Sequence, residues 1–175
     1  GKCNAFYCLD GRVVVLREPK LTMRHILIPE ALRSSRYRLY FEKQLAHWED
    51  TPTYPMEEWS SYILGAECAM EDHEKGVATT KFDEVSACLE FSVYALGTAM
   101  AVKRMDIDYW DQEVNFKRFI KFNLSRAEKV FFKGRHIFKS EPQEKLLEAF
   151  RKHPDGNEMR SFMHKEFGCF FMRDQ

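Results

Sequence analysis

The chain has 175 residues, of which 45% are hydrophobic and 31% charged; this composition suits a folded domain with a sizeable core and excludes a disordered chain. Lys plus Arg and Asp plus Glu are equal at 27 each, so any polyanion-binding role must come from a local patch. We expect one domain, 1–175, of α+β class. An N-terminal β-hairpin or meander at 1–28 would pack on a mostly helical part at 29–175 with a central buried helix.

The first residues predict a β-hairpin. Asp10-Gly11 is a preferred two-residue turn of type I′, and runs of aromatic and β-branched residues flank it. Pairing across such a turn predicts two opposed pairs, Tyr7 with Val14 and Phe6 with Val15. Both faces of the hairpin are then largely apolar. We therefore expect it to be covered on both sides or to receive a third strand, for which 22–28 is the candidate.

Apolar spacing predicts two helices next, at 30–48 and 56–72, with the proline-containing loop 51–55 between them. The first helix would carry an apolar stripe at Tyr37, Phe41, Leu45 and Trp48. The second would carry one at Trp59, Ile63, Ala66 and Met70. Gly76 is expected to end the second helix.

Residues 80–105 form the longest helical pattern, opened by a capping-box signature at Thr80 and Asp83. Its apolar run is just long enough for a transmembrane span. Glu90 inside the run would cost about 2.5–3.5 kcal/mol at the centre of a bilayer, so we favour a central helix wrapped by others and expect no membrane span. Glu90 then needs an Arg or Tyr partner from a neighbouring element; the alternative is a catalytic acid.

The C-terminal half predicts further helices. One runs over 108–124, and a capping-box signature at Ser125 starts another, with a hairpin over 130–138 as the alternative. A third signature at Ser140 precedes a helix that buries Leu146, Leu147 and Phe150. A last helix covers 157–167, and 169–172 returns as an edge strand or a docked tail.

Charge is strongly segregated along the chain. Residues 44–74 contain eight acids and no Lys or Arg, whereas 114–139 contain eight Lys or Arg and one acid. The basic segment would offer nucleic acid or an acidic partner these side chains: Lys117, Lys121, Arg126, Lys129, Lys133, Arg135 and Lys139. The simpler interpretation is that the two segments are neighbours in the fold. Helical spacing turns the phenylalanines of the basic segment inward, so a binding patch would be purely electrostatic and salt-sensitive.

Two further groups are weaker candidates. Trp48, Tyr54 and Trp59 could present aromatic anchors to a protein partner, or pin their loop to the core. The carboxylates of Asp106, Asp108 and Asp111 could hold a hard cation in a metal-dependent hydrolase. Carboxylates near a helix start are also ordinary partners of the helix dipole, and that interpretation is favoured.

No phosphate-binding glycine loop, zincin helix, nucleophile elbow or CxxC pair occurs, so we expect no cofactor and no metal. The five irregularly spaced cysteines and the lack of a signal-peptide pattern favour reduced thiols in the cytoplasm or another reducing compartment. The sequence favours a non-enzymatic protein-interaction or assembly module: a subunit or accessory factor of a larger complex, or a viral or bacterial factor that binds a host protein. RNA or DNA binding through the basic segment is the alternative, and metal-dependent hydrolysis is third.

Overall fold

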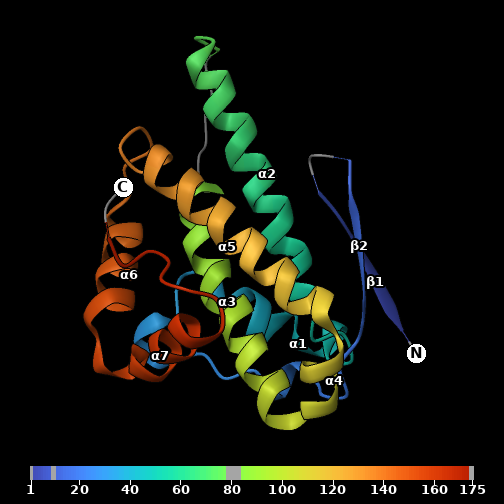
Figure 1. Cartoon of the computed structure of the whole chain (residues 1–175). Coiled ribbons are helices and arrows are strands. Elements are labelled where there is room, and N and C mark those ends of the chain that lie inside the picture. Colours follow the sequence, from blue (N-terminus) through green and yellow to red (C-terminus); the bar gives the residue numbers. More distant parts are fainter. Residues whose placement is uncertain (1, 9–10, 78–83, 174–175) are drawn as a thin grey trace.

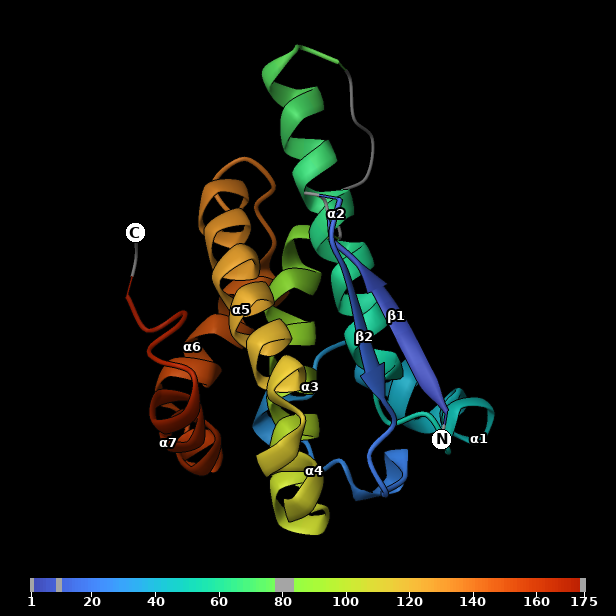
Figure 2. The ribbon, with the colours of Figure 1, turned by 45° about the vertical axis from the view of Figure 1, so that its right-hand side comes forward.

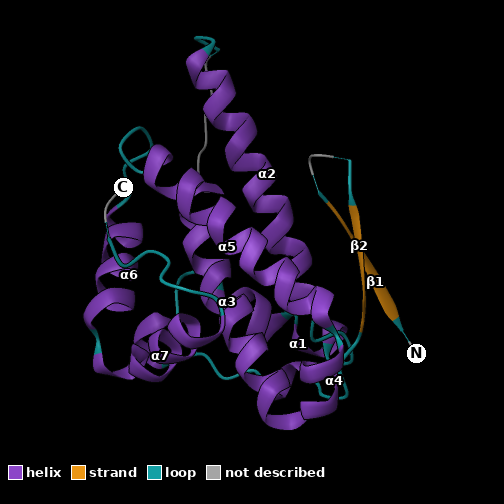
Figure 3. Cartoon of the chain, in the orientation of Figure 1, coloured by secondary structure: helices purple, strands orange, loops and turns teal. Residues whose placement is uncertain are grey.

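The computed structural model describes residues 2–8, 11–77 and 84–173. It is a mostly helical α+β fold in which a two-stranded antiparallel sheet lies against one side of the helices (Figures 1 and 3). The strands and α-helices are β1 (Cys3–Tyr7), β2 (Val13–Arg17), α1 (Leu45–Trp48), α2 (Tyr54–Glu74), α3 (Glu84–Met105), α4 (Ile107–Gln112), α5 (Val114–Gly134), α6 (Glu141–Lys152) and α7 (Asn157–Glu166). Short 3-10 helices lie at Met23–His25, Glu30–Leu32 and Pro154–Gly156, and a π-helix lies at Arg38–Lys43.

The predicted central helix is confirmed as α3. It packs against α2, α4, α5, α6 and α7. Within the described part of the chain, α3 is the one helix long and apolar enough to cross a membrane, and 94% of its most apolar stretch is buried among the other helices. The capping residues predicted at Thr80 and Asp83 lie outside the described residues.

Gly97 allows the segment between the 3-10 helices at Met23–His25 and Glu30–Leu32 to approach α3 closely. A Cβ at this position would lie 2.5 Å from Ile28 Cδ1 and 3.4 Å from the Leu27 carbonyl oxygen. We expect Gly97→Ala to lower the free energy of unfolding by about 1–3 kcal/mol, because overpacking a buried site outweighs the gain in helix propensity. Ile28→Val removes the clashing Cδ1, so the double variant should lose less than the sum of the two single losses in urea denaturation. Additive losses of stability would contradict a close contact between position 97 and Ile28.

The hairpin is confirmed, but its predicted register is wrong by one residue. Tyr7 pairs with Val13 and Phe6 with Val14. The closing pair is Cys8 with Arg12, whose backbone N–H···O distance is 2.8 Å, so the loop has three residues and not two. Gly11 has φ +78°, the left-handed conformation that three-residue hairpin loops require. Asp10, the other predicted turn residue, lies outside the described residues.

The expected third strand does not form at 22–28. The segment instead contains a 3-10 helix, because the Thr22 backbone N–H donates to His25 Nδ1 at 3.0 Å and closes a tight turn. Within the described residues the sheet therefore has two strands, and the expectation that both faces are covered is wrong. One face packs on the helices and the other is exposed, as Figure 2 shows from the side of the hairpin.

The single helix predicted over 30–48 is also wrong. A 3-10 helix, an irregular stretch, a π-helix and the short α1 occupy this region. The chain leaves helical geometry around Ser34 because the side chains of Ser34 and Arg36 turn inward to bind Glu90 on α3. Apolar spacing predicts a helix from neighbouring residues alone. It therefore cannot account for Glu90, which lies more than fifty residues from Ser34 and Arg36 in the sequence.

In the basic segment, α5 is one continuous helix, so the helix start predicted at Ser125 and the alternative hairpin over 130–138 are both wrong. The apolar face continues through Leu124, Ala127 and Phe131, which are all buried. The real break lies earlier, at Glu113, whose ψ of 76° separates α4 from α5 within the helix predicted over 108–124.

The remaining helix predictions are confirmed with small shifts at their ends. The predicted apolar face of α2 is buried, and so are the three apolar residues predicted on α6. Gly76 and Gly168 follow α2 and α7 with φ values of +71° and +114°. Residues 169–172 form a docked tail, with Phe171 fully buried.

Candidate protein-interaction surface

The acidic and basic segments are neighbours, as the simpler interpretation of their charges predicted. Helices α2 and α5 lie side by side in Figures 1 and 2. Arg126 on α5 donates to both carboxylate oxygens of Glu67 on α2, at 3.3 and 2.6 Å. Lys133 pairs with Glu74, and this contact lowers the pKa of the Glu74 carboxyl. Much of the basic charge is therefore balanced within the fold.

The other basic candidates lie in different surroundings. Arg135 pairs with Glu144 of α6 at 2.6 Å, and Lys117 lies over the Trp110 ring at 5.2 Å from its centroid. Three are exposed: Lys121, Lys129 and Lys139. Four of the six phenylalanines in this segment are buried, namely Phe116, Phe119, Phe131 and Phe132, while Phe122 and Phe138 are half-buried. The predicted arrangement, rings inward and cations outward, is thus confirmed for most of the segment.

The aromatic candidates around the loop before α2 are mostly part of the core. Trp59 is fully buried and Tyr54 is 8% exposed. Trp48 is half-buried and stacks on Tyr54, with ring centroids 4.0 Å apart. In this conformation the loop is pinned to the core, and Trp48 is only partly accessible to a partner.

The Asp106, Asp108 and Asp111 cluster is built around the start of α4. Asp106 caps this helix by accepting from the Tyr109 backbone N–H at 3.3 Å, and it also accepts from the Lys20 backbone N–H at 2.7 Å. Asp108 and Asp111 are exposed. Among the residues that the structure describes, no group of three His, Cys, Asp or Glu side chains could hold a metal ion.

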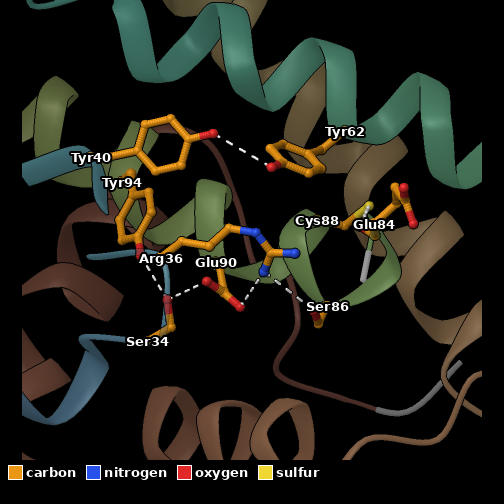
Figure 4. A network of polar contacts seen from close by, with 9 residues as sticks. All are labelled: Ser34, Arg36, Tyr40, Tyr62, Glu84, Ser86, Cys88, Glu90 and Tyr94. Atoms are coloured by element: carbon orange, nitrogen blue, oxygen red, sulfur yellow. Dashed lines mark hydrogen bonds and ion pairs between the residues drawn. The ribbon is translucent and has the colours of Figure 1, made fainter. Parts of the chain in front are cut away.

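Glu90 has the arginine partner that its position required (Figure 4). Arg36 Nη1 lies 2.7 Å from Glu90 Oε1, and the two side chains are only 8% and 6% exposed. Ser34 donates to the second carboxylate oxygen and lies 2.6 Å from the Tyr94 hydroxyl. The Arg36 guanidinium also lies over the Tyr62 ring. The ion pair at the centre of this network is buried and each charge has its partner, so we assign it a structural role.

The exposed face of the hairpin carries three exposed large apolar side chains on one regular surface. We call it the outer face: Cys3, Ala5, Tyr7, Val13, Val15 and Arg17. Tyr7 is 73% exposed, Val15 54% and Val13 47%. Scattered exposed apolar residues are ordinary, but adjacent ones on a regular surface are typical of contact sites. Tyr7 and Val13 are direct cross-strand neighbours, and Val15 is the next residue on that face.

The hairpin is held firmly against the helices. Phe6 on its inner face packs on Phe119 of α5, with ring centroids 4.7 Å apart. Glu18 accepts hydrogen bonds from the backbone N–H and hydroxyl of Thr53, at 3.2 and 2.5 Å. Burial raises the pKa of the Glu18 carboxyl, and the bonds from Thr53 act in the opposite direction. At the end of β2, the Tyr109 hydroxyl donates to the Arg17 carbonyl at 2.6 Å.

A hollow of about 410 Å³ separates β2 from the N-terminal half of α5. We call it the β2–α5 hollow, and it is lined by Cys8, Arg12, Val13, Val14, Asn115, Arg118, Phe119 and Phe122. The α5 residues follow helical spacing and so form one face of that helix. Phe122 also lines a second hollow of about 420 Å³ between α2 and α5, where Glu67, Glu71 and the cations of α5 meet. The two hollows thus differ in charge balance.

The outer face was not among the candidate sites predicted from sequence. Its signal was present in the two apolar faces predicted for the hairpin, but the hairpin was expected to be covered on both sides or to receive a third strand. No family model matches the chain, and neither curated proteins nor solved structures give a significant match.

Proposed function

We propose that this chain is a protein-interaction module that binds its partner through the outer face and the adjoining β2–α5 hollow. The observation that carries the proposal is the exposure of Tyr7, Val13 and Val15 together on a regular, anchored strand surface. Aromatic and aliphatic side chains held rigidly on a surface contribute to binding at low entropic cost. The chain would act as a subunit or accessory factor of a larger complex.

RNA or DNA binding through α5 remains the second candidate, and the ion pairs of that helix weigh against it. Arg126, Lys133 and Arg135 each have a carboxylate partner within the fold, so phosphates would have to compete with those carboxylates. We expect the triple charge reversal Lys117→Glu, Lys121→Glu and Lys129→Glu to leave retention on heparin at low salt nearly unchanged. Retention that is strong in the unmodified chain and lost in the variant would favour nucleic acid instead.

Photo-crosslinking tests the interaction module. A benzoylphenylalanine at Val15 should give a defined adduct in a lysate of the source organism, and the same residue at Lys145 on α6 should not. Lys145 is a suitable control because its side chain is 73% exposed and α6 lies on the far side from the hairpin (Figure 1). The partner identified from the adduct is then purified and its binding measured directly.

Substitution of the outer face completes the test. Tyr7→Ser together with Val13→Ser should weaken binding of the purified partner by more than about tenfold, equivalent to about 1.4 kcal/mol, while the circular dichroism spectrum stays unchanged. Equal adducts at Val15 and Lys145, or equal affinity of the double variant, would contradict the proposal.

A further inference from the structure

We propose that the β2–α5 hollow binds an extended acidic segment of a partner protein, which adds to the sheet as a third strand along the free edge of β2. This inference rests on the proposed function and specifies the chemistry of its partner. Three features of the described residues carry it: the direction of the backbone groups of β2, the charge of the hollow and its apolar floor.

The hydrogen-bonding pattern of the hairpin leaves donors and acceptors at the edge of β2. The Cys8 N–H donates to the Arg12 carbonyl and the Glu18 N–H to the Lys2 carbonyl, so even-numbered residues exchange the bonds within the sheet. The N–H and C=O groups of Val13 and Val15 therefore point away from β1. The Tyr109 hydroxyl bound to the Arg17 carbonyl confirms this direction, since it approaches from α4. In the described part of the chain, the outward groups of Val13 and Val15 have no hydrogen-bond partner.

This edge faces a helix across the hollow and is not simply open to solvent. Figure 2 shows β2 between β1 and α5, with its free edge toward α5. A strand edge facing a helix is the arrangement in which known peptide-binding domains add an extended peptide to a sheet. The added backbone would lie about 4.8 Å from β2 and bond to its outward groups. The bonds from Glu18 and Tyr109 hold the edge in place before binding, which lowers the ordering cost.

The charge of the hollow selects an acidic segment. Arg12 and Arg118 line it, Lys121 lies one helical turn further along α5, and no carboxylate occurs among its described lining residues. Neither Arg118 nor Lys121 has an ion-pair partner within the described chain, in contrast to Arg126 on the other side of Phe122. Carboxylates on alternate residues of the added strand would meet these cations.

The floor of the hollow accepts apolar side chains from the same segment. Phe119 is buried, Phe122 and Val14 are half-buried, and the Arg12 guanidinium lies 5.5 Å from the centroid of the Phe122 ring. Side chains alternate between the two faces of a strand. The segment that fits therefore alternates apolar residues, directed to this floor, with acidic residues directed to the exposed Arg118 and Lys121 of α5.

Fluorescence anisotropy with the full chain tests the inference. The probe is a labelled octapeptide that alternates valine and glutamate. One control peptide has lysine in place of glutamate, and a second carries N-methyl groups on alternate amides, which removes the strand hydrogen bonds and keeps the charge. We expect both controls to bind at least about tenfold more weakly than the probe. Equal binding of the N-methylated peptide would overturn strand addition, and absence of probe binding would overturn the inference.

Variants of the chain locate the site. Arg118→Glu with Lys121→Glu should weaken the probe at least about tenfold, and the matched pair Lys145→Glu with Lys152→Glu on α6 should not. Val13→Pro removes only an outward donor and should abolish binding, whereas Ala5→Pro removes the equivalent donor from the opposite edge of β1 and should not. If the two charge-reversal pairs weaken probe binding equally, or the two proline variants do, the probe does not bind in the β2–α5 hollow.

The outcomes separate this inference from the proposed function. A partner crosslinked at Val15 whose binding is lost in the Tyr7 and Val13 serine variant, but unaffected by charge reversal at Arg118 and Lys121, supports the interaction module and overturns the acidic strand. A second copy of the chain is the other candidate occupant of the β2 edge, and sedimentation of the isolated chain tests for it. A dimer that Val13→Pro dissociates would show that a second copy fills the edge, and this too would overturn the inference.

Discussion

Glu90→Leu is expected to lower the free energy of unfolding by about 3–5 kcal/mol, because it leaves the Arg36 guanidinium charged and buried without its carboxylate partner. Both side chains are less than one-tenth exposed, so water cannot replace the lost contact. Arg36→Met should cost a similar amount for the reciprocal reason. Urea denaturation followed by circular dichroism at neutral pH measures these losses.

The double variant distinguishes pairing from general damage to the core. Arg36→Met with Glu90→Leu removes both charges and keeps most of the volume, so it should recover much of the stability lost in either single variant. Ser34 and Tyr94 keep their mutual hydrogen bond in that background. The exposed pair Lys75 and Glu71 is the control, and Glu71→Gln should change stability by less than about 0.5 kcal/mol. A loss in the double variant equal to the sum of the single losses would refute the coupling.

The sequence alone was sufficient to predict the helices that a local apolar pattern specifies. In α2, Trp59, Ile63 and Ala66 repeat at helical spacing and are fully buried. On α6, Leu146, Leu147 and Phe150 are buried at helical spacing, whereas the central α3 was predicted from its long apolar run and is buried nearly all round. Segregated charge was informative as well, because the simpler interpretation, that the acidic and basic segments are neighbours, is confirmed by ion pairs between α2 and α5.

Local patterns failed where a distant contact or a single extra loop residue decided the structure. The break in the helix predicted over 30–48 depends on Arg36 reaching Glu90 on a helix that follows much later. The register of the hairpin depended on whether its loop has two or three residues, and both choices suit Gly11. Ser125 carries a capping signature, yet it is exposed in the middle of α5, where buried neighbours on both sides continue the helix.

The candidate surface could be predicted only in part. Alternation along the two strands identifies Tyr7, Val13 and Val15 as one apolar face once the register is known. That the face stays exposed could not be predicted, because the pattern of the strands does not show whether another element packs on it. The β2–α5 hollow could not be predicted, because it depends on how far the hairpin stands from α5.

Phe171→Ala is expected to lower the free energy of unfolding by about 3–5 kcal/mol. Its position four residues from the end of the sequence would not by itself suggest so large an effect. The ring is fully buried and contacts Phe131, Phe132 and Phe150, with centroids 5.8, 6.1 and 6.2 Å away. Its removal would leave a cavity against α5 and α6. Thermal and urea denaturation both measure the loss.

The backbone of Phe171 explains why the tail should detach and not repack in this variant. Its φ of +60° is an uncommon conformation for a residue with a side chain, and it persists only where surrounding contacts enforce it. The Phe171 N–H donates to Glu128 at 2.6 Å, and its carbonyl accepts from Arg151 at 2.6 Å. Without the ring, these two bonds and the partly buried neighbours Phe170 and Met172 must hold a strained residue, so hydrogen exchange at its amide should accelerate strongly. Phe170→Ala, at a half-buried neighbour, should have a smaller effect on both measurements, and an equal effect would show that the tail docks as a whole and not through Phe171.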